Sequence, residues 1–399
     1  MKVLVTDGEN RSSLAVTRSL GRMGCKVVVT SKDKRNIAAL SKYCWKTYQV
    51  PDPRHRKTVY VDAIQAIANR EGVEVIFPTT DMSIHLLNPI RQMLFPAILA
   101  CPNNGKVETV SDKVSVFQLA GKLNVPIPNT LYLISAEDLD GLIEKITHYP
   151  VVVKPSKSRT PEGNGFLPGG VRYAASEQEL IHLYATHRVL QYPSMIQEMV
   201  IGPGTGLFTL YDLDRHIALF SHRRIREKPP SGGISVVSES VPLDEEMVNN
   251  AGRLLSSVGW QGVAMVEFKR DLRDGKAKLM EINGRFWGTL QLAIACGVDF
   301  PSLYLDYLQG KQFPENIRDY RIGLKLKWFF GTLDHLLIRL KNRDKKLNLP
   351  PGSPSKWEAF KDFLKIWERN ATFDVFDRND VGPFWFEAQS YVWHLLKRS

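Results

Sequence analysis

The chain has 399 residues, of which 43% are hydrophobic and 24% charged, so it can bury the cores of two or three globular domains. Its net charge of +11 is compatible with phosphorylated substrates, nucleic acid or an acidic membrane surface, and does not choose among them. No apolar run approaches the ~18 residues of a membrane-spanning helix, and the first residues do not resemble a secretory signal. The four cysteines are scattered without a C-x-x-C pair, which is typical of free thiols in a reducing compartment and predicts a cytoplasmic protein.

Residues 1–108 alternate short apolar strands with helices, which predicts a Rossmann-like domain built on a parallel sheet. The expected strands are residues 2–6, 26–30, 75–78 and 97–100, and the expected helices are residues 12–23 and 60–71. The first turn has Gly8 alone rather than G-x-G-x-x-G, so no dinucleotide site is predicted. Asp81 follows the third strand, at the edge where such sheets bind ligands, although a helix N-cap explains it equally well.

Residues 109–310 form a second α/β region. A helix is expected at residues 113–123, and the expected strands are residues 151–154, 194–198, 206–211, 216–221, 263–270 and 277–283. Between the first two of these strands, residues 156–170 are so rich in glycine, serine and proline that we expect no regular structure there.

The composition changes at residue 311, and residues 311–399 are expected to form a mainly helical C-terminal extension that is basic and aromatic. Helices are predicted at residues 324–340 and 357–367, separated by a polar, proline-rich break. From residue 321 onward, 15 Lys and Arg stand against 9 Asp and Glu, so this segment holds +6 of the net charge. Aromatic residues beside lysines suggest peripheral contact with an acidic membrane or a partner, but an ordinary packed extension is at least as compatible with the pattern.

The strands expected at residues 263–270 and 277–283 are joined by the turn signal Asp274-Gly275, which predicts a β-hairpin. Side chains alternate along a strand, so Glu281, Asn283 and Arg285 share one face. Glu267 joins that face, opposite or diagonal to Glu281, in any register whose paired residue numbers sum to an even value near 548. Two carboxylates placed so closely repel each other unless a cation lies between them. Carboxylate and amide oxygens are the ligands that Mg²⁺ or Mn²⁺ prefers. The alternative is a solvated strand face with scattered charges.

Two lysines and a flexible loop could surround phosphate groups. Lys154 ends an apolar strand, and a buried ammonium is costly without an anion. The loop that follows contains Gly169 and Gly170, whose backbone N–H groups are free to approach phosphate oxygens. Lys113 begins the preceding helix. Taken alone, each lysine is equally explained as a strand-end or surface residue.

The order of these features closely resembles the ATP-grasp superfamily of carboxylate–amine ligases, which includes D-alanine–D-alanine ligase, biotin carboxylase and carbamoyl-phosphate synthetase. The resemblance spans residues 1–310, and its most specific part is Glu267 followed by Glu281-Ile-Asn-Gly-Arg285. It implies an α/β and α+β architecture: a Rossmann-like domain (1–108), a two-subdomain ATP-grasp domain (109–310) and the helical extension (311–399).

The resemblance also implies roles for individual residues. ATP would be held through the phosphate-binding lysines, the loop glycines and a segment beside adenine: Lys113, Lys154, Gly169, Gly170, Gln197, Glu198, Met199 and Val200. Glu267, Glu281 and Asn283 would bind Mg²⁺ (or Mn²⁺). Arg285, with Lys154, would stabilise the transferred phosphoryl group. The loop at residues 156–170 would close over the phosphates.

The chain departs from the family pattern in two places. Many relatives carry a carboxylate for the ribose after the adenine segment, but residues 202–206 contain none. On the substrate side, Arg223, Arg224 and Arg226 lie near the expected cleft and are suited to an anionic substrate; a basic hairpin edge that prevents aggregation explains them equally well.

The favoured function is an ATP- and Mg²⁺-dependent ligase that activates a carboxylate as an acyl phosphate, joins it to an amine or similar nucleophile, and releases ADP and phosphate. Its partners would be the small-molecule carboxylate and amine, not nucleic acid, because the basic residues are dispersed without a recognised nucleic-acid motif. The alternative is a non-catalytic nucleotide-binding adaptor that acts through its basic C-terminal region. The oligomeric state is not predicted.

Overall fold

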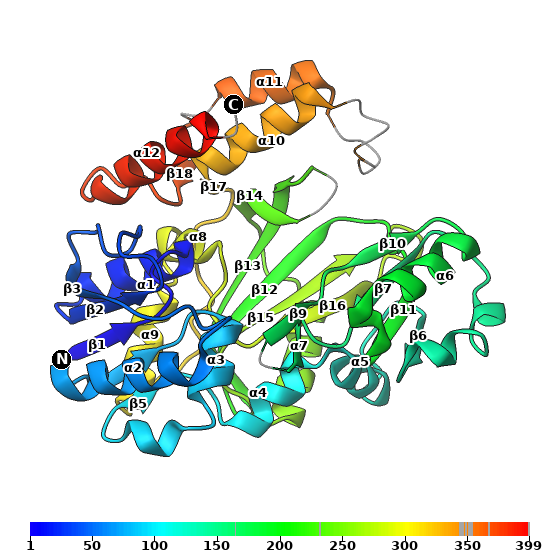
Figure 1. Ribbon diagram of the computed structural model, residues 1–399. Coiled ribbons are helices and arrows are strands. Elements are labelled where there is room, and N and C mark those ends of the chain that lie inside the picture. The colour runs from blue at the N-terminus through cyan, green and yellow to red at the C-terminus, as the bar shows by residue number, and fades with distance from the viewer. Residues whose placement is uncertain are drawn as a thin grey trace.

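The structure is a computed structural model that describes residues 1–163, 165–230, 233–342, 347, 349, 354–365 and 368–397. Within these residues the chain forms a mixed α/β arrangement of four sheets with helices packed around them (Figure 1). None of the described helices combines the length and apolarity needed to cross a membrane.

The N-terminal sheet has the strand order β3-β2-β1-β4-β5, and all of its pairs are parallel. Its strands are β1 (Lys2–Val5), β2 (Lys26–Ser31), β3 (Cys44–Gln49), β4 (Val75–Phe77) and β5 (Ile98–Leu99). The helices that follow them are α1 (Arg11–Arg22), α2 (Lys57–Glu71), α3 (Asp81–Leu87) and η1 (Arg91–Leu94). The expected βα alternation is therefore present, since apolar strands buried on both faces need helices on each side.

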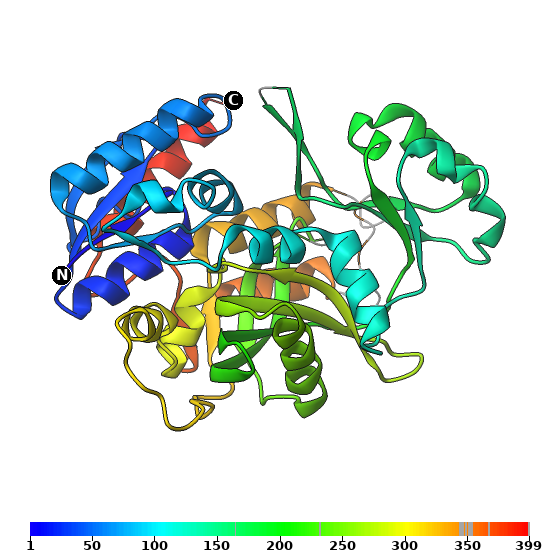
Figure 2. The same ribbon diagram turned by 90° about the horizontal axis from the view of Figure 1, so that it is seen from below.

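A small antiparallel sheet, ordered β10-β7-β11-β6, lies on the far side of the molecule with its own core (Figures 1 and 2). Its strands are β6 (Thr130–Leu133), β7 (Val151–Pro155), β10 (Arg172–Ala174) and β11 (Ser194–Glu198). The helices of this part are α6 (Glu177–Thr186), η2 (Ala136–Leu139), η3 (Ile143–Lys145) and η4 (Arg188–Gln191). The preceding helices α4 (Asn104–Ser111) and α5 (Lys113–Lys122) pack instead on the core that the two larger sheets share.

The largest sheet has seven described strands in the order β16-β15-β12-β13-β14-β17-β18. They are β12 (Gly204–Asp212), β13 (Arg215–Lys228), β14 (Ile234–Ser240), β15 (Gln261–Arg270), β16 (Ala277–Asn283), β17 (Lys325–Lys327) and β18 (Ala371–Phe373). The helices α7 (Glu245–Ser257), α8 (Leu290–Cys296) and α9 (Phe300–Leu308) pack on its faces. Two shared apolar cores join this sheet to the N-terminal sheet, so the two cannot move far independently.

The C-terminal helices α10 (Phe329–Lys341), α11 (Lys356–Leu364) and α12 (Gly382–Leu396) form a layer above the sheets (Figure 1). The helix predicted at residues 324–340 is wrong at its start, because residues 325–327 form β17 and pair with β14. Strands β17 and β18 therefore extend the large sheet with residues from the C-terminal extension, while the predicted domain boundaries stay predictions.

Arginines on α1 attach the C-terminal extension to the N-terminal sheet. Arg18 Nε lies 2.8 Å from Asp380 Oδ2, with both side chains almost fully buried, and Arg22 and Arg11 pair with Asp377 and Asp374. The central Asp380 also accepts hydrogen bonds from the Ser41 hydroxyl and the Lys42 backbone. A buried ion pair of this kind fixes the two segments in one register, because separating them would leave a buried charge without a partner.

Candidate functional site

The site is built around the β15–β16 hairpin, and the prediction that Glu267 and Glu281 share one face is confirmed: Glu267 pairs directly with Glu281, and Met265 pairs with Asn283. A β-bulge follows this pair, between Glu267 and Phe268. The Asn283 amide donates a 2.9 Å hydrogen bond to Glu281 Oε1, so three oxygen-bearing side chains occupy one short stretch of one face. The opposite face, with Val266 and Phe268, is buried in the core, which forces the carboxylates onto the other side.

The two carboxylates titrate differently because their cationic neighbours differ. Burial raises the pKa of Glu267 to about 7, against the opposing effect of the Arg224 guanidinium, with which it forms an ion pair. Burial also acts on Glu281, but Lys113, the Asn283 amide and Lys154 outweigh it and hold the pKa of that carboxyl below its usual range. In the described part of the chain no three His, Cys, Asp or Glu side chains gather, so the candidate cation site consists of two carboxylates and an amide.

Both predicted lysines face this hairpin. Lys154 lies on β7 with 9% of its surface exposed, its Nζ is 5.6 Å from the Phe117 ring centroid, and burial lowers its pKa to about 8. In the described chain its ammonium forms no hydrogen bond or close ion pair, which is an unusual condition for a buried amine. Lys113 is the first residue of α5, after the N-cap Asp112, and its Nζ donates to Ser158 Oγ at 2.8 Å.

The prediction that residues 156–170 lack regular structure is wrong for two stretches of this segment, while Asn164 lies outside the described residues. Residues Arg159–Glu162 (β8) and Gly165–Pro168 (β9) form an antiparallel hairpin that projects from the small sheet (Figure 2). A Cβ at Gly169 would lie 2.1 Å from the Lys157 carbonyl oxygen, so this position requires glycine, whereas Gly170 has open space around it.

The hairpin reaches across to the N-terminal domain. Lys57 Nζ, at the start of α2, lies 3.9 Å from the Phe166 ring centroid and 3.3 Å from the Gly165 carbonyl oxygen. The β8–β9 hairpin therefore spans the space beside the lysines and the carboxylate pair. This contact could not be anticipated from the sequence, because nothing local links α2 to a loop more than a hundred residues away.

The segment predicted to contact adenine ends β11, where Gln197 is buried and Glu198 is half-buried. Gln197 lies on the Lys154 face of the sheet, because Met195 pairs with Lys154. Its Nε2 donates to Thr130 Oγ1 at 2.9 Å, and its Oε1 is buried with no partner among the described residues. Met199 and Val200 follow directly, half-buried and buried respectively.

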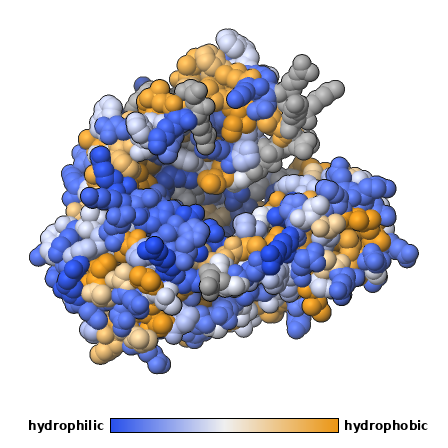
Figure 3. Space-filling view, in the orientation of Figure 1, coloured by the Kyte–Doolittle hydropathy of each residue, from blue (hydrophilic) through white to orange (hydrophobic). Residues whose placement is uncertain are grey.

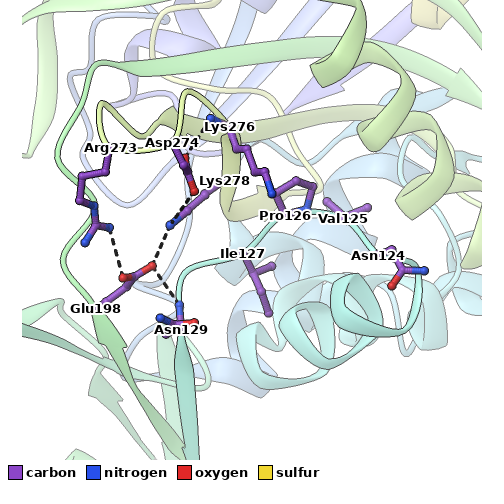
Figure 4. Close-up of a pocket in the computed structure, with 10 residues that line it drawn as sticks. All are labelled: Asn124, Val125, Pro126, Ile127, Asn129, Glu198, Arg273, Asp274, Lys276 and Lys278. Carbon is purple, nitrogen blue, oxygen red and sulfur yellow. Dashed lines mark hydrogen bonds and ion pairs between the residues drawn. The ribbon is translucent and has the colours of Figure 1, made fainter. Parts of the chain in front are cut away.

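Glu198 points the other way, toward a polar cavity of about 590 Å³ beside the β15–β16 turn (Figure 4). Its carboxylate accepts hydrogen bonds from Lys278 Nζ at 2.8 Å and the Asn129 backbone, and pairs with Arg273 at 3.2 Å. Lys278 also pairs with the fully buried Asp271. The side chain of Glu198 thus links β11 to the hairpin turn, and its carboxylate is already paired with Lys278 and Arg273.

Arg285 is held from three sides. Its Nε lies 2.9 Å from Asp81 Oδ1, its Nη1 donates to the Phe286 carbonyl oxygen at 3.0 Å, and its Nη2 is 3.4 Å from Asn283 Oδ1. Asp81 is the first residue of α3, and the N-cap of that helix is Thr80. Of the two explanations left open by the sequence, the N-cap is therefore wrong, and Asp81 lies at the site through its ion pair with Arg285.

The three arginines of β13 are separated. Arg224 pairs with Glu267 and, at 2.8 Å, with Glu227. Arg223 points to the other face and pairs with Glu239 at 2.6 Å, while Arg226 pairs with Asp362 of α11. Ser231 and Gly232, from the segment that follows, lie outside the described residues. Only Arg224 therefore meets the carboxylate pair, and Glu227, which the sequence did not single out, is its second partner.

Comparisons with known proteins agree with this geometry. Residues 221–329 match the family model described as "ATP-grasp in the biosynthetic pathway with Ter operon". The D-aspartate ligase of Enterococcus faecium (strain Aus0004) is 21% identical over 253 residues, which cover 60% of this chain and 60% of that protein. The match thus spans only about 60% of that relative's length.

Solved structures share the fold at low sequence identity. Biotin carboxylase from Campylobacter jejuni, in a complex with an ATP analogue, aligns with a TM-score of 0.64 and 17% identity over 81% of this chain and 74% of that one. L-amino acid ligase from Bacillus licheniformis aligns with a TM-score of 0.60 and 16% identity over 78% and 76%. N5-carboxyaminoimidazole synthetase from Staphylococcus aureus gives 0.61 and 13% over 81% and 80%. The family model, the ligase relative and these folds all indicate the ATP-grasp superfamily of ligases.

Proposed function

We propose that the protein is an ATP- and Mg²⁺-dependent ligase that joins a small-molecule carboxylate to an amine or similar nucleophile in the cytoplasm, releasing ADP and phosphate. The observation that carries the proposal is the direct opposition of Glu267 and Glu281 on a face with Asn283. Two buried carboxylates in register destabilise a hairpin, so their placement makes physical sense when a divalent cation lies between them. The donor set is all oxygen, which suits Mg²⁺ or Mn²⁺.

The nucleotide would lie between the small sheet and the β15–β16 hairpin. Lys154, which is buried without a hydrogen-bond partner among the described residues, and Lys113 would contact its phosphates, with the backbone at Gly169 and Gly170 closing over them. Adenine would lie against Gln197–Val200, where Gln197 Oε1, buried without a partner in the described part of the chain, can accept a hydrogen bond from its amino group. Glu198 would act by holding this segment in place, because its carboxylate is engaged by Lys278 and Arg273.

The reaction follows from where these charges lie. Mg²⁺ would be held by Glu267, Glu281 and Asn283. Its charge would neutralise the negative charge that builds on the phosphate oxygens during transfer. A substrate carboxylate oxygen attacks the γ-phosphorus, the bond to the β-phosphate oxygen breaks, and ADP leaves. The amine then attacks the acyl carbon, and inorganic phosphate departs. Arg285 and Lys154 hold the phosphoryl oxygens during both steps.

Arg224 is the proposed anchor for the carboxylate substrate. Its guanidinium pairs with Glu267 when no cation neutralises that carboxylate. A divalent cation at Glu267 competes for the same oxygen, which frees one edge of the guanidinium to bind a carboxylate in the two-point manner that arginine favours. Arg223 and Arg226 form ion pairs with Glu239 and Asp362, and their role would be to stabilise the fold.

The domain layout is part of the proposal. Residues 1–108 would be a Rossmann-like domain that helps to hold the substrates, residues 109–310 the two ATP-grasp subdomains, and residues 311–399 an extension that covers the cleft. The hollow between the C-terminal helices and the body below them is visible in Figure 3 and is compatible with substrate entry from that side.

The test measures ADP and phosphate release with Mg·ATP and a panel of amino acids and other carboxylates, with and without amines. Glu281→Gln removes a cation ligand with an isosteric side chain, so it is expected to fold, while the activation barrier for turnover rises by roughly 3 kcal/mol or more. Glu239→Gln, on β14 and paired with Arg223 outside the site, is the matched control and should keep full activity. Full activity in Glu281→Gln would overturn the proposed cation site.

A further inference from the structure

The outward side of the C-terminal helices is apolar where a folded protein normally presents polar residues. Trp357 on α11 and Trp385 on α12 are each 61% exposed, and Trp393 is 57% exposed. Other exposed apolar side chains on these helices are Leu337, Leu340, Leu364, Val392 and Leu395. Figure 3 shows hydrophobic residues gathering over this top surface. Patches of this kind mark surfaces that something else covers.

The internal contacts of α12 leave part of its surface bare, although Phe386 also packs on the core that the N-terminal sheet shares, beneath Arg35. Phe384 and Tyr391 stack on Phe330, and Glu387 accepts a 2.7 Å hydrogen bond from Trp328 Nε1. These residues recur at helical spacing and form the side that packs inward. Trp385 and Val392 lie on the other side, so α12 is apolar both where it packs and where it is exposed.

The charges around the patch suit an anionic surface. Lys361 Nζ lies 5.4 Å from the Trp357 ring centroid, and Lys397 Nζ lies 5.0 Å from that of Trp393. Glu387, the only acidic residue of α12, is directed inward. The segment from residue 321 onward carries 15 basic and 9 acidic residues. Exposed tryptophans beside lysines match the boundary of a bilayer, where an aromatic ring enters the headgroup region and the ammonium meets lipid phosphate.

The end of α12 favours lipid over a protein partner. The four successive residues 392–395 are all exposed, and four successive residues point in directions that nearly complete the circumference of a helix. A rigid protein surface covers one side of a helix, whereas a bilayer interface can deform around it. Since no described helix is suited to span a membrane, such contact would be interfacial.

We infer that the outward face of α11 and α12 binds the surface of a bilayer rich in anionic phospholipid. The protein would then work at a membrane surface. The inference is independent of the ligase chemistry, because none of the residues in the patch belongs to the candidate site.

The test is co-sedimentation of the full chain with vesicles of pure phosphatidylglycerol and, separately, pure phosphatidylcholine. Binding to phosphatidylglycerol is expected at low salt, weaker binding at high salt, and little to phosphatidylcholine. The double variant Trp385→Ser/Trp393→Ser should bind roughly tenfold more weakly. Trp45→Ser is the matched control, since Trp45 is 45% exposed on β3 with Lys2 and Lys26 beside its ring, and it should bind like the unmodified chain.

A second variant, Lys361→Glu/Lys397→Glu, keeps every apolar contact and should also lose binding to phosphatidylglycerol. Circular dichroism on all variants verifies that they fold. No binding at low salt, or equal binding by the tryptophan variant and the unmodified chain, would overturn the inference. A dimer in light scattering that becomes a monomer in the tryptophan variant would also overturn it, because the patch would then join two copies of the chain.

Discussion

Asp81 Oδ1 and Arg285 Nε form a 2.9 Å ion pair that joins the N-terminal domain to the end of the β15–β16 hairpin. Partial loss of solvent acts to raise the pKa of Asp81, but the charge of Arg285 and its hydrogen bond outweigh it and lower that pKa. With Nε held by Asp81 and Nη1 by the Phe286 carbonyl, the guanidinium has one preferred orientation. A residue on the carboxyl edge of the N-terminal sheet thereby sets the direction of an arginine proposed to hold the transferred phosphoryl group.

Asp81→Asn should therefore lower kcat while leaving the KM for ATP nearly unchanged, because the orientation of Arg285 matters most in the transition state. We expect a loss of roughly 10- to 100-fold. The Arg285→Lys variant should lose activity too, and combining the two changes should add little. Asp62→Asn, an exposed change on α2 of the same domain, is the control. A rise in KM with kcat intact would assign Asp81 to ATP binding instead.

The contact between Lys57 and Phe166 should control closure of the β8–β9 hairpin. Hydrogen exchange in residues 159–168 is expected to slow when Mg²⁺ and a non-hydrolysable ATP analogue are added. Phe166→Ala and Lys57→Ala should each reduce that added protection and raise the KM for ATP several-fold. Lys122→Ala, at the end of α5, should change neither. Equal protection with and without nucleotide in the unmodified chain would argue against a lid.

Asp380→Ala should be the most destabilising single change in the α1 interface, because it leaves the buried Arg18 without its partner. The expected loss is about 3–5 kcal/mol in the free energy of unfolding. Asp377→Ala removes the partner of Arg22, in an ion pair that is more exposed than the pair of Arg18 and Asp380. The free energy of unfolding should therefore fall by less than about 1 kcal/mol. Urea unfolding of both variants measures the difference, and similar losses in the two would contradict the importance of burial.

Stability should also depend on Glu387, whose pKa burial raises to about 7. A carboxyl with a raised pKa favours the folded state in its protonated form, so this contribution is present below about pH 4.5 and is lost as the pH rises through 7. Glu387→Gln keeps an acceptor for Trp328 and should lessen the fall in stability over that window, by at most about 3 kcal/mol. Glu108→Gln, an exposed change on α4, should leave the pH profile as it was.

The sequence revealed those parts of the site that follow from local periodicity. Alternation and the Asp274-Gly275 turn were enough to predict that Glu267 and Glu281 share a face, although not that they are directly opposed. The N-cap Asp112 places Lys113 at the start of a helix. Composition failed at residues 156–170, where glycine and proline suggested a loop, but cross-strand pairing between β8 and β9 prevails.

Contacts between distant segments could not be predicted. The apolar run that starts at residue 324 is compatible with a helix or a strand, and pairing of β17 with the edge of β14 decides for a strand. The position of Asp81 after a strand predicts that it lies at the edge of the sheet. Its pairing with Arg285 depends on how the N-terminal sheet packs against the hairpin, which the sequence does not reveal. The same holds for Glu227, which becomes relevant only because Arg224 lies beside it.

The central claim is that ATP activates a carboxylate by phosphorylation, and the fate of oxygen tests it most directly. Carboxylates that support ADP release are prepared with ¹⁸O and incubated with the protein, Mg·ATP and hydroxylamine as a general nucleophile. We expect ADP, a hydroxamate and inorganic phosphate that carries one atom of the label for each turnover. The Glu281→Gln variant should produce none of these. Label in AMP, with release of pyrophosphate, would contradict the central claim.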